Sequence, residues 1–461
     1  MLCHAGFNQS HTKLIKLSKN SFSRQVSLLV GGTAAAQLLN VLSLPFLTRL
    51  YSPSEFGILA IYVSIINIVA SVACLRLEIA IPIPRHDREA ARLLVISILS
   101  ALSICLLTAA IVFIFKSEID LLLGKQALEK YYWLIPIGIM GNSLYASFQY
   151  WTTRKKRFTL IAKTKVVQAV GSIGTQILLA GLGFNSFGLL IGYVVSSSAG
   201  FVSLSRETRN QEKNKFRNIR PRALLHTLKK YQRFPKYSTL EALGNSTALQ
   251  VPILMIASLS LGPEVGYLML ATRVMAAPMT LIGRAVGQVY LSRAPDEFRE
   301  GTLHTFTNTI LSGLVKTGVG PLIFAGIVSP YIFPLVFGSS WQRAGEIVSW
   351  MTPWFVMQFI TSPISMTLHV LNRQRSALVL QMLGLAMRVG SVLLAASIAK
   401  PYVIEAYAIS GFVFYSIYFL VVVLSADLEI KDALKALGKG FPIILAWGGL
   451  GVLSILILRH F

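Results

Sequence analysis

The chain has 461 residues, of which 54% are hydrophobic and only 13% are charged. A typical soluble domain is about 25% charged, so the scarcity of polar residues excludes a soluble protein of this length. The apolar residues come in runs of about 20, the length that crosses a hydrocarbon core about 30 Å thick as a helix. Because helices satisfy their own backbone hydrogen bonds in lipid, the chain is predicted to be an all-α integral membrane protein.

Thirteen segments are predicted to span the membrane. They are 25–47, 55–75, 91–115, 131–151, 159–181, 186–204, 238–260, 264–291, 304–336, 341–370, 375–398, 402–424 and 440–458. The segment 304–336 contains three prolines and is predicted to be one broken helix. Residues 1–20 contain three lysines and no apolar core, so they are not expected to form a cleavable signal peptide. The sequence leaves open whether 440–458 is a true span or an accessory helix.

Basic residues predict the orientation of these spans. With the N-terminus in the cytoplasm, 32 of the 43 Lys and Arg fall in cytoplasmic segments and 7 fall in outer segments. This asymmetry follows the positive-inside rule, and topology and anionic lipid headgroups then explain the net charge of +24. Nucleic-acid binding is disfavoured because the basic residues are spread over many loops. We expect the loop 205–236 and both ends of a twelve-helix core to be cytoplasmic.

A tight turn of similar sequence follows the first and the seventh predicted spans. Residues 52–57 read Ser-Pro-Ser-Glu-Phe-Gly, and residues 262–266 read Gly-Pro-Glu-Val-Gly. Each turn places Pro and Glu at the start of the next helix, where both are favoured. With the most basic loop between the halves, the pattern predicts two parallel six-helix repeats related by a pseudo-twofold axis along the membrane normal, which is a transporter plan.

The predicted organisation therefore has five parts. They are a cytoplasmic N-terminal segment 1–21, a six-helix bundle 22–204, a basic cytoplasmic linker 205–236, a second six-helix bundle 237–425 and a tail 426–461 with a thirteenth helix.

The sequence lacks the common catalytic and nucleotide-binding motifs. It contains no G-x-x-x-x-G-K-[ST] loop, no D-x-D metal site, no paired carboxylates for glycosyl chemistry and no His/Cys cluster. All five Asp fall in predicted loops, and no Glu lies at a predicted midplane. An intramembrane glycosyltransferase and a cation exporter are both disfavoured, since each would need anionic groups there. We expect a protein that is not an enzyme and that has no cofactor and no metal.

Four cations lie inside predicted spans: Arg273, Arg284, Lys316 and Arg388. Each costs roughly 2.5–3.5 kcal/mol at the centre of a membrane helix, and no midplane carboxylate is available as a partner. Arg273 and Arg284 share a helix face, with Pro278 between them to kink the helix. Lys316 lies beside two glycines and a proline, where the helix is expected to loosen.

We interpret Arg273, Lys316 and Arg388 as one cationic site in a water-filled cavity that receives an anionic ligand. Neutralising one of them should then spare folding. The alternative is that each cation pairs separately with helix carbonyls.

Polar side chains on single helix faces supply the rest of the predicted cavity lining. They are Gln37 and Asn40 in the first span, Ser64, Asn67 and Ser71 in the second, and Gln358, Ser362, Ser365 and His369 in the tenth. A sugar-bearing ligand needs such neutral partners, although the same residues are also typical of hydrogen bonding between helices. His369 is a candidate proton-coupling group, but a lone His at a helix end is more often simply interfacial.

Four stretches of the chain resemble a known family. They are Gly32 to Gly57, with Leu44-Pro45-Phe46-Leu47-Thr48-Arg49-Leu50-Tyr51 within it, then Leu75-Arg76-Leu77-Glu78-Ile79-Ala80-Ile81, Tyr231-Gln232-Arg233-Phe234-Pro235-Lys236-Tyr237 and Gly287-Gln288-Val289-Tyr290. Over about residues 22–425 the chain resembles the bacterial lipid-linked oligosaccharide flippases, the Wzx-type O-antigen and polysaccharide export proteins of the multidrug/oligosaccharidyl-lipid/polysaccharide superfamily.

This resemblance implies a V-shaped pair of six-helix bundles around a central cavity. It implies that a glycan repeat unit on undecaprenyl pyrophosphate is flipped from the cytoplasmic to the periplasmic leaflet of the bacterial inner membrane. Implied partners are the lipid-linked glycan, membrane lipids and a polysaccharide polymerase. The glycan, any coupling ion and the oligomeric state are left open.

Two alternatives remain from other classes. A drug/cation antiporter of the same superfamily is disfavoured because the first span has no acidic residue. A polysaccharide polymerase is disfavoured because no large outer loop is available for catalytic groups.

Arg49, Arg76 and Glu78 lie within the resembling stretches and complete the predicted binding residues. Arg76 and Glu78 are two residues apart, so on a continuous helix they would not face each other. We expect Arg76 to contact the incoming ligand or lipid headgroups. Glu78 is expected to pair across the bundle, for example with a basic residue of the second half.

Overall fold

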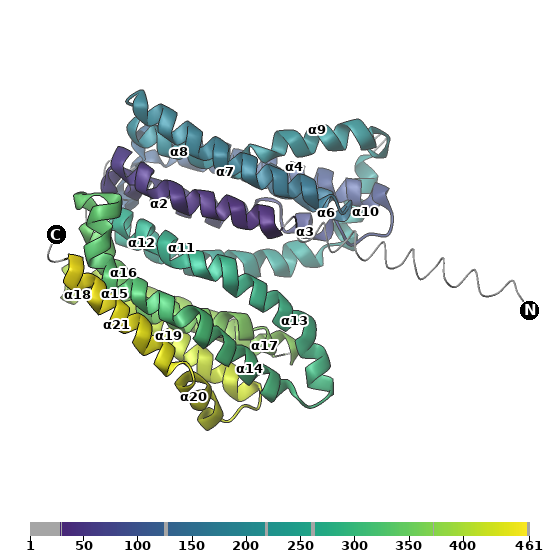
Figure 1. The fold of residues 1–461 in the computed structure, drawn as a ribbon. Coiled ribbons are helices and arrows are strands. Elements are labelled where there is room, and N and C mark those ends of the chain that lie inside the picture. The colour runs from purple at the N-terminus through teal and green to yellow at the C-terminus, as the bar shows by residue number, and fades with distance from the viewer. Residues whose placement is uncertain are drawn as a thin grey trace, which may run out of the picture. The chain divides into compact units, whose positions relative to one another are not determined.

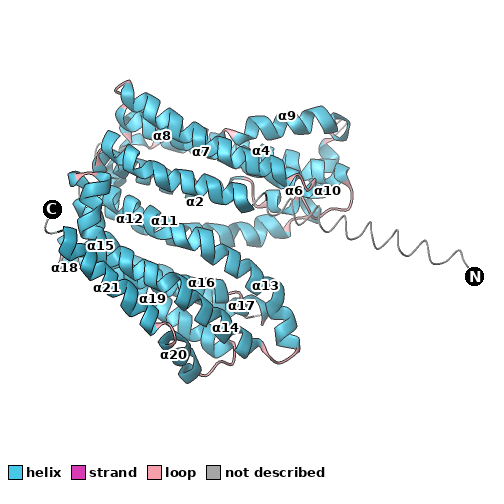
Figure 2. Cartoon of the chain, in the orientation of Figure 1, coloured by secondary structure: helices cyan, strands magenta, loops and turns pink. Residues whose placement is uncertain are grey.

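The secondary structure is helical throughout the part of the chain that the computed structural model describes (Figures 1 and 2). The described residues are 28, 30–123, 128–216, 220–259, 263–371 and 373–458. Each of the thirteen predicted spans contains a helix. The predicted N-terminal segment 1–21 lies outside the described residues.

Among the described residues, nine helices are long and apolar enough to cross a membrane. They include the first helix, Val30–Leu50, and the last, Phe441–Leu458. The other predicted spans are occupied by helices that carry more polar residues: α6, α7, the pair α12 and α13, and α16.

The first half begins with the helix Val30–Leu50. It continues with α2 (Pro53–Ala73), α3 (Leu77–Ala80), α4 (Asp87–Ile114), α5 (Lys116–Leu123), α6 (Leu134–Arg154), α7 (Phe158–Gly181), α8 (Asn185–Ser198), α9 (Gly200–Glu212) and α10 (Pro221–Lys230).

The second half comprises α11 (Thr239–Ser258), α12 (Glu264–Pro278), α13 (Arg284–Arg299), α14 (Leu303–Leu314), α15 (Gly320–Phe337), α16 (Gln342–Ile364), α17 (Thr367–Val370), α18 (Gln374–Ile398), α19 (Val403–Ser425), α20 (Ile430–Gly438) and α21 (Phe441–Leu458). Helix α21, yellow in Figure 1, packs on α15 through Trp447, whose ring centroid lies 5.6 Å from that of Phe324.

The chain forms two compact units. The first comprises residues up to Ser43, Ile66–Lys116 and Lys130–Leu243, and the second comprises Leu44–Ile65, Ser117–Glu129 and Gly244–Phe461. The boundary at Leu243 lies six residues beyond the start predicted for the second bundle at 237, and the second unit also takes parts of the first two helices.

The described residues of the predicted basic linker 205–236 are mostly helical, whereas the sequence was interpreted as a loop there. Helix α9 extends through Glu212, and α10 follows after a short gap. Apolar residues give α10 an inner face, and Leu224 and Leu228 pack against the buried cluster around Leu77, Leu93 and Trp151. Burial of this face stabilises a helix that charge alone would not predict.

Three short π-helical turns interrupt the α-helices, and each contains or adjoins a proline. They are Phe234–Ser238 with Pro235, Met279–Gly283 after Pro278, and Val315–Val319 before Pro321. Because proline removes a backbone donor and clashes with the preceding turn, the local hydrogen-bond register changes there. The predicted irregularity at Pro278 and the predicted loosening at Lys316 are confirmed, whereas α15 continues through Pro330 and Pro334.

The two repeated turns of the sequence meet within the second unit. The backbone nitrogen of Gly266 lies 3.6 Å from where a Cβ on Gly57 would stand. Ser52 and Glu55 form a capping box, in which the Glu55 carboxylate accepts hydrogen bonds from the Ser52 backbone N–H at 2.7 Å and from its hydroxyl at 2.9 Å. The fully buried Trp341 contacts Phe56 and Tyr267 edge-on, one from each turn's helix.

We predict that Gly266→Ala destabilises the protein while Gly57→Ala is tolerated. A Cβ on Gly266 would overlap the carbonyl oxygen of Pro53, whereas a Cβ on Gly57 would make ordinary contacts. Backbone would have to move in the first variant only, at a cost of about 1–3 kcal/mol. Thermal unfolding of both variants in detergent would measure this, and equal Tm values would contradict the close approach.

Candidate functional site

The chain turns sharply where α2 ends. Helix α2 stops at Ala73, and Leu75 and Arg76 adopt left-handed backbone conformations, with φ of 53° and 57°. Two successive non-glycine residues in this region are strained, at roughly 1–3 kcal/mol each, and such strain is concentrated at functional sites. The short helix α3 begins directly after Arg76.

This turn brings Arg76 over Glu78. Their side chains lie 3.8 Å apart, from Nη1 to Oε1. The expectation that these residues do not face each other was wrong, because it assumed one continuous helix. The left-handed turn changes the direction of the chain between α2 and α3, and residues two apart then meet.

Glu78 is a buried carboxylate beside a partly exposed guanidinium. It is 6% exposed, and its chain neighbours Leu77, Ala80 and Ile81 are fully buried. Burial raises the pKa of Glu78 above its usual value. Within the described residues its Oε2 has no hydrogen-bond partner, and neither has Nε of Arg76. Buried polar atoms are normally satisfied, so this corner retains the capacity to bind a further polar group.

A network of ion pairs holds the loop after α3. Arg154 at the end of α6 donates to the carbonyls of Pro82 at 3.2 Å and Pro84 at 2.6 Å, and it pairs with Asp87 at 3.0 Å. Lys155 pairs with Asp87 at 2.8 Å and with Glu212 of α9 at 2.9 Å. Although burial opposes its charge, these bonds raise the pKa of Lys155.

Sequence reasoning missed this network, because it treated Asp87 as a loop residue and counted Arg154 and Lys155 only toward the topology. Lys215 also pairs with Asp87, so residues far apart in the chain converge on one carboxylate. The loop that follows Arg76 and Glu78 is thereby fixed against α6 and α9.

In the second unit, Arg388 of α18 is enclosed by aromatic rings. It is 2% exposed, and its guanidinium lies 5.7 Å from the Trp354 ring and 5.0 Å from the Phe414 ring. Stacking on aromatic faces stabilises a desolvated guanidinium by about 2 kcal/mol or more per contact. We therefore no longer expect that neutralising Arg388 spares folding. We expect instead that it destabilises the protein, because the contacts of the guanidinium with the rings are lost.

Lys316 and Arg273 lie in other surroundings. Lys316 is exposed on the π-helical turn Val315–Val319, and Arg273 is half-buried on α12. Arg284 begins α13, but its side chain lies outside what the structure describes. The described contacts do not bring Arg273, Lys316 and Arg388 together, so the single cationic site stays a prediction.

The remaining predicted residues mostly bond within their own unit. Nη2 of Arg49 donates to the carbonyl of Leu335 at 3.3 Å, and Asn67 accepts from the Tyr193 hydroxyl at 3.3 Å. The Ser362 carbonyl accepts from Ser365, as is common in membrane helices.

Three of the predicted polar residues have less defined partners. Gln37 and Asn40 are half-buried on the first helix. Gln358 has a buried Oε1 without a hydrogen-bond partner among the described residues, which leaves it able to accept a bond from a ligand. The His369 side chain lies outside the described part.

A second ion-pair group, in the second unit, gathers three carboxylates around one arginine. Arg343 bonds Glu405 of α19 at 2.5 Å, Glu346 at 3.1 Å and Glu264 of α12 at 3.3 Å. Glu405 is 6% exposed. Arg343 thus ties α12, α16 and α19 together, a role that its solitary position in a predicted outer segment did not indicate.

We predict that Arg343→Gln lowers the free energy of unfolding by about 1–3 kcal/mol. Removing the guanidinium leaves Glu405 buried without its partner, which costs about 3–5 kcal/mol for a fully buried pair and less for this partly exposed one. Arg299→Gln is the control, since its pair with Asp296 is exposed. Thermal unfolding should separate the two variants, and equal Tm values would contradict the assignment.

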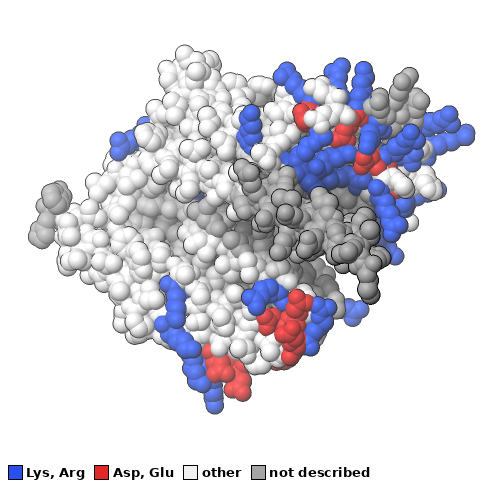
Figure 3. All heavy atoms as spheres, turned by 45° about the vertical axis from the view of Figure 1, so that its right-hand side comes forward, with Lys and Arg blue, Asp and Glu red and all other residues white. Residues whose placement is uncertain are grey.

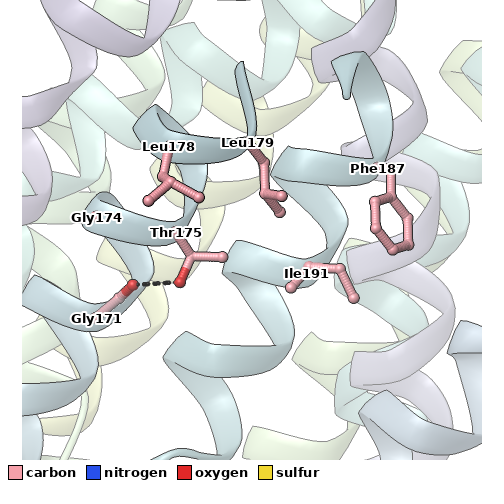
Figure 4. A pocket seen from close by; sticks show the side chains of 7 residues that line it. All are labelled: Gly171, Gly174, Thr175, Leu178, Leu179, Phe187 and Ile191. Atoms are coloured by element: carbon pink, nitrogen blue, oxygen red, sulfur yellow. Dashed lines mark hydrogen bonds between the residues drawn. The ribbon is translucent and has the colours of Figure 1, made fainter. Parts of the chain in front are cut away.

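Hollows elsewhere on the described surface are mainly apolar. One, of about 580 Å³, lies between α7 and α8 and is lined by residues that include Gly171, Thr175 and Phe187 (Figure 4). The Thr175 hydroxyl donates to the Gly171 carbonyl at 2.7 Å, so the groove offers little polar capacity. The described residues also contain no group of three His, Cys, Asp or Glu that could hold a metal ion.

Comparison with known proteins places the chain in a family. Residues 46–346 match the family described as "Polysaccharide biosynthesis protein". The succinoglycan biosynthesis transport protein ExoT of Rhizobium meliloti (strain 1021) is 24% identical over 318 residues, covering 67% of this chain and 61% of that protein. The uncharacterized protein Rv3630 of Mycobacterium tuberculosis (strain ATCC 25618 / H37Rv) is 26% identical over 224 residues, covering 48% and 49%. The chain thus spans between about half and three fifths of the length of these relatives.

Solved structures share the fold at low sequence identity. The lipid II flippase MurJ in an inward closed conformation has a TM-score of 0.74, with 16% identity over 94% of this chain and 98% of that one. An inward-facing multidrug resistance MATE family transporter of the MOP superfamily has a TM-score of 0.55, with 15% identity over 87% and 93%. The predicted all-α fold of two helical bundles is confirmed by these likenesses. Since its family match covers more than half of its length, the chain belongs to the polysaccharide biosynthesis protein family and has the fold of flippases and multidrug transporters.

Proposed function

We propose that this protein is a flippase for undecaprenyl-pyrophosphate-linked oligosaccharide repeat units. It moves them from the cytoplasmic to the periplasmic leaflet of a bacterial inner membrane by alternating access, for the synthesis of a surface polysaccharide such as O-antigen. The family match over residues 46–346 carries this proposal. The names of a succinoglycan transport protein and a lipid II flippase among the similar proteins support a lipid-linked glycan as the substrate class.

The Arg76–Glu78 corner suits the cytoplasmic step of such a cycle. The basic-residue asymmetry predicts that α2 ends on the cytoplasmic side, where the pyrophosphate of the substrate would arrive. Arg76 is partly exposed, and its Nε has no hydrogen-bond partner among the described residues. A guanidinium binds phosphate oxygens strongly through paired N–H donors. Glu78 beside it orients the guanidinium.

The remaining predicted residues supply the other proposed contacts. Arg273, Lys316 and Arg284 are proposed to bind the pyrophosphate as it crosses, and Arg49 to contact it near the outer end. Gln37, Asn40, Asn67, Gln358 and Ser362 are proposed to bind the sugars. Arg388 acts from within its aromatic enclosure, where it would hold α16, α18 and α19 in position. The same fold also occurs in multidrug transporters, so a cationic-drug efflux assay is the direct test of the alternative.

We predict that Lys316→Gln and Arg273→Gln each reduce polysaccharide export at least about tenfold, since a charge-assisted hydrogen bond contributes about 1.5–3 kcal/mol. The measurement is surface polysaccharide in a flippase-deficient host, normalised to the membrane level of the protein. Lys435→Gln is the control, because Lys435 is 73% exposed and pairs with Asp432 on its own helix. Arg388→Lys should retain only part of the wild-type export, since a lysine lacks the planar guanidinium of arginine. Full export by Lys316→Gln and Arg273→Gln would refute the cationic site.

A separate prediction concerns Glu78. Glu78→Gln should leave the protein level unchanged, because a neutral isostere fits a buried position that disfavours charge, while export falls several-fold as Arg76 loses its partner. Glu300→Gln, at an exposed position on the end of α13, is the matched control. Unchanged export with Glu78→Gln at a normal protein level would show that Glu78 has no role in transport.

A further inference from the structure

A pocket of about 440 Å³ opens on the first unit between α4, α6 and α9. Its volume lies in the range of about 300–1,000 Å³ that is usual for small-molecule sites. Leu94 and Ile98 of α4 and Phe148 of α6 form part of its floor, with Phe216 after α9. The Phe148 ring lies 5.5 Å from that of Phe201, and the Phe216 ring 5.3 Å from that of Trp151. The floor is therefore apolar, and two of its rings pack against further aromatic side chains.

The rim of the same pocket is basic. Arg206, Arg209 and Lys213 line it, and all three are exposed. The described lining contains no carboxylate, and the hydroxyls of Ser205 and Thr208 bond carbonyls of their own helix. An apolar floor below a cationic rim matches the two chemical parts of an anionic amphiphile.

The charges of α9 are segregated so that this rim stays unneutralised. Arg206 and Arg209 are three residues apart on α9 and share a face, and Lys213, directly after the helix, lines the same pocket. The acids of the helix point elsewhere: Glu207 pairs with Arg157, and Glu212 pairs with Arg157 and Lys155. Figure 3 shows Lys and Arg side chains gathered over the upper right of the molecule, with acidic groups between them.

The pocket lies at the membrane boundary predicted to be cytoplasmic. Leu94 is seven residues into α4, or about 10 Å along the helix from Asp87, while the basic rim lies in the second half of α9 and directly after it. Basic pockets between membrane helices on that side bind the headgroups of anionic lipids.

We propose that this pocket is a binding site for an anionic glycerophospholipid, with its phosphate on Arg206, Arg209 and Lys213 and an acyl chain over Leu94, Ile98 and Phe148. A free phosphate would use only the rim and would leave the apolar floor exposed to water. A neutral lipid would use only the floor. The inference stands independently of the proposed transport function.

The test is retention of phosphatidylglycerol by the full-length protein, measured by native mass spectrometry against phosphatidylcholine with the same chains. We expect selective retention of phosphatidylglycerol by the wild type. Replacing Arg206, Arg209 and Lys213 together by Gln should weaken it by on the order of 100-fold, since each basic side chain near an anionic headgroup contributes about fivefold. Replacing Arg220, Arg222 and Lys229 by Gln is the control, because it removes the same charge from exposed positions at α10.

A second variant tests the acyl-chain part of the site. Val95 of α4 also lines the pocket. Val95→Trp would fill the pocket without changing its charge, and it should reduce retention of long-chain phosphatidylglycerol while sparing that of a dihexanoyl analogue. Equal losses in the two triple variants would overturn the proposal by showing nonspecific charge attraction. Displacement of the lipid by inorganic phosphate at the concentration of the dihexanoyl analogue would overturn it in favour of a free phosphate site.

Discussion

The internal satisfaction of backbone hydrogen bonds is the constraint on which this structure depends. In a bilayer no water replaces a lost hydrogen bond, so a chain of apolar runs is obliged to be helical. Departures from the α-helix are then confined to places where chemistry forces them. Three prolines impose π-helical turns, while the left-handed pair Leu75 and Arg76 lies beyond the end of α2, where backbone strain does not strand bonds in lipid. These irregular segments also carry two of the candidate ligand-binding cations. Lys316 lies on one π-helical turn, and Arg76 lies at the left-handed corner.

A buried charge obeys the same logic with different partners. The sequence offers no carboxylate at the depth of Arg388, and the structure solves the problem with the faces of Trp354 and Phe414. Lys316 instead remains exposed on its turn. A cation that is enclosed by rings is held in place, whereas one that is exposed is available to a ligand. Arg388 therefore suits a structural role and Lys316 suits ligand binding, although the sequence predicted the same role for both.

The positions of the helices were predictable from the sequence, but the tertiary contacts between them were not. Runs of about 20 apolar residues locate helices without any knowledge of contacts, and each predicted span contains one. The helical character of α10 was missed because its basic residues dominated its composition, while its packing on the cluster around Trp151 is a tertiary effect. The pairing of Arg76 with Glu78 depends on positive φ at a leucine and an arginine, which residue type does not signal. Arg343 gathers carboxylates that lie 3 to 79 residues away in the chain, a convergence that spacing alone cannot show.

Each group of ion pairs is internal to one compact unit. Asp87, Arg154, Lys155 and Glu212 belong to the first unit, and Arg343 with its three carboxylates belongs to the second. Ion pairs that are partly buried are costly to break, so they hold the helices of a unit to one another. In the alternating-access cycle proposed above, a movement that keeps each unit intact would leave all of these pairs unbroken. The strong polar contacts of the described residues would thus rigidify the moving parts, and the free energy of the conformational change would be set by weaker contacts and by the substrate.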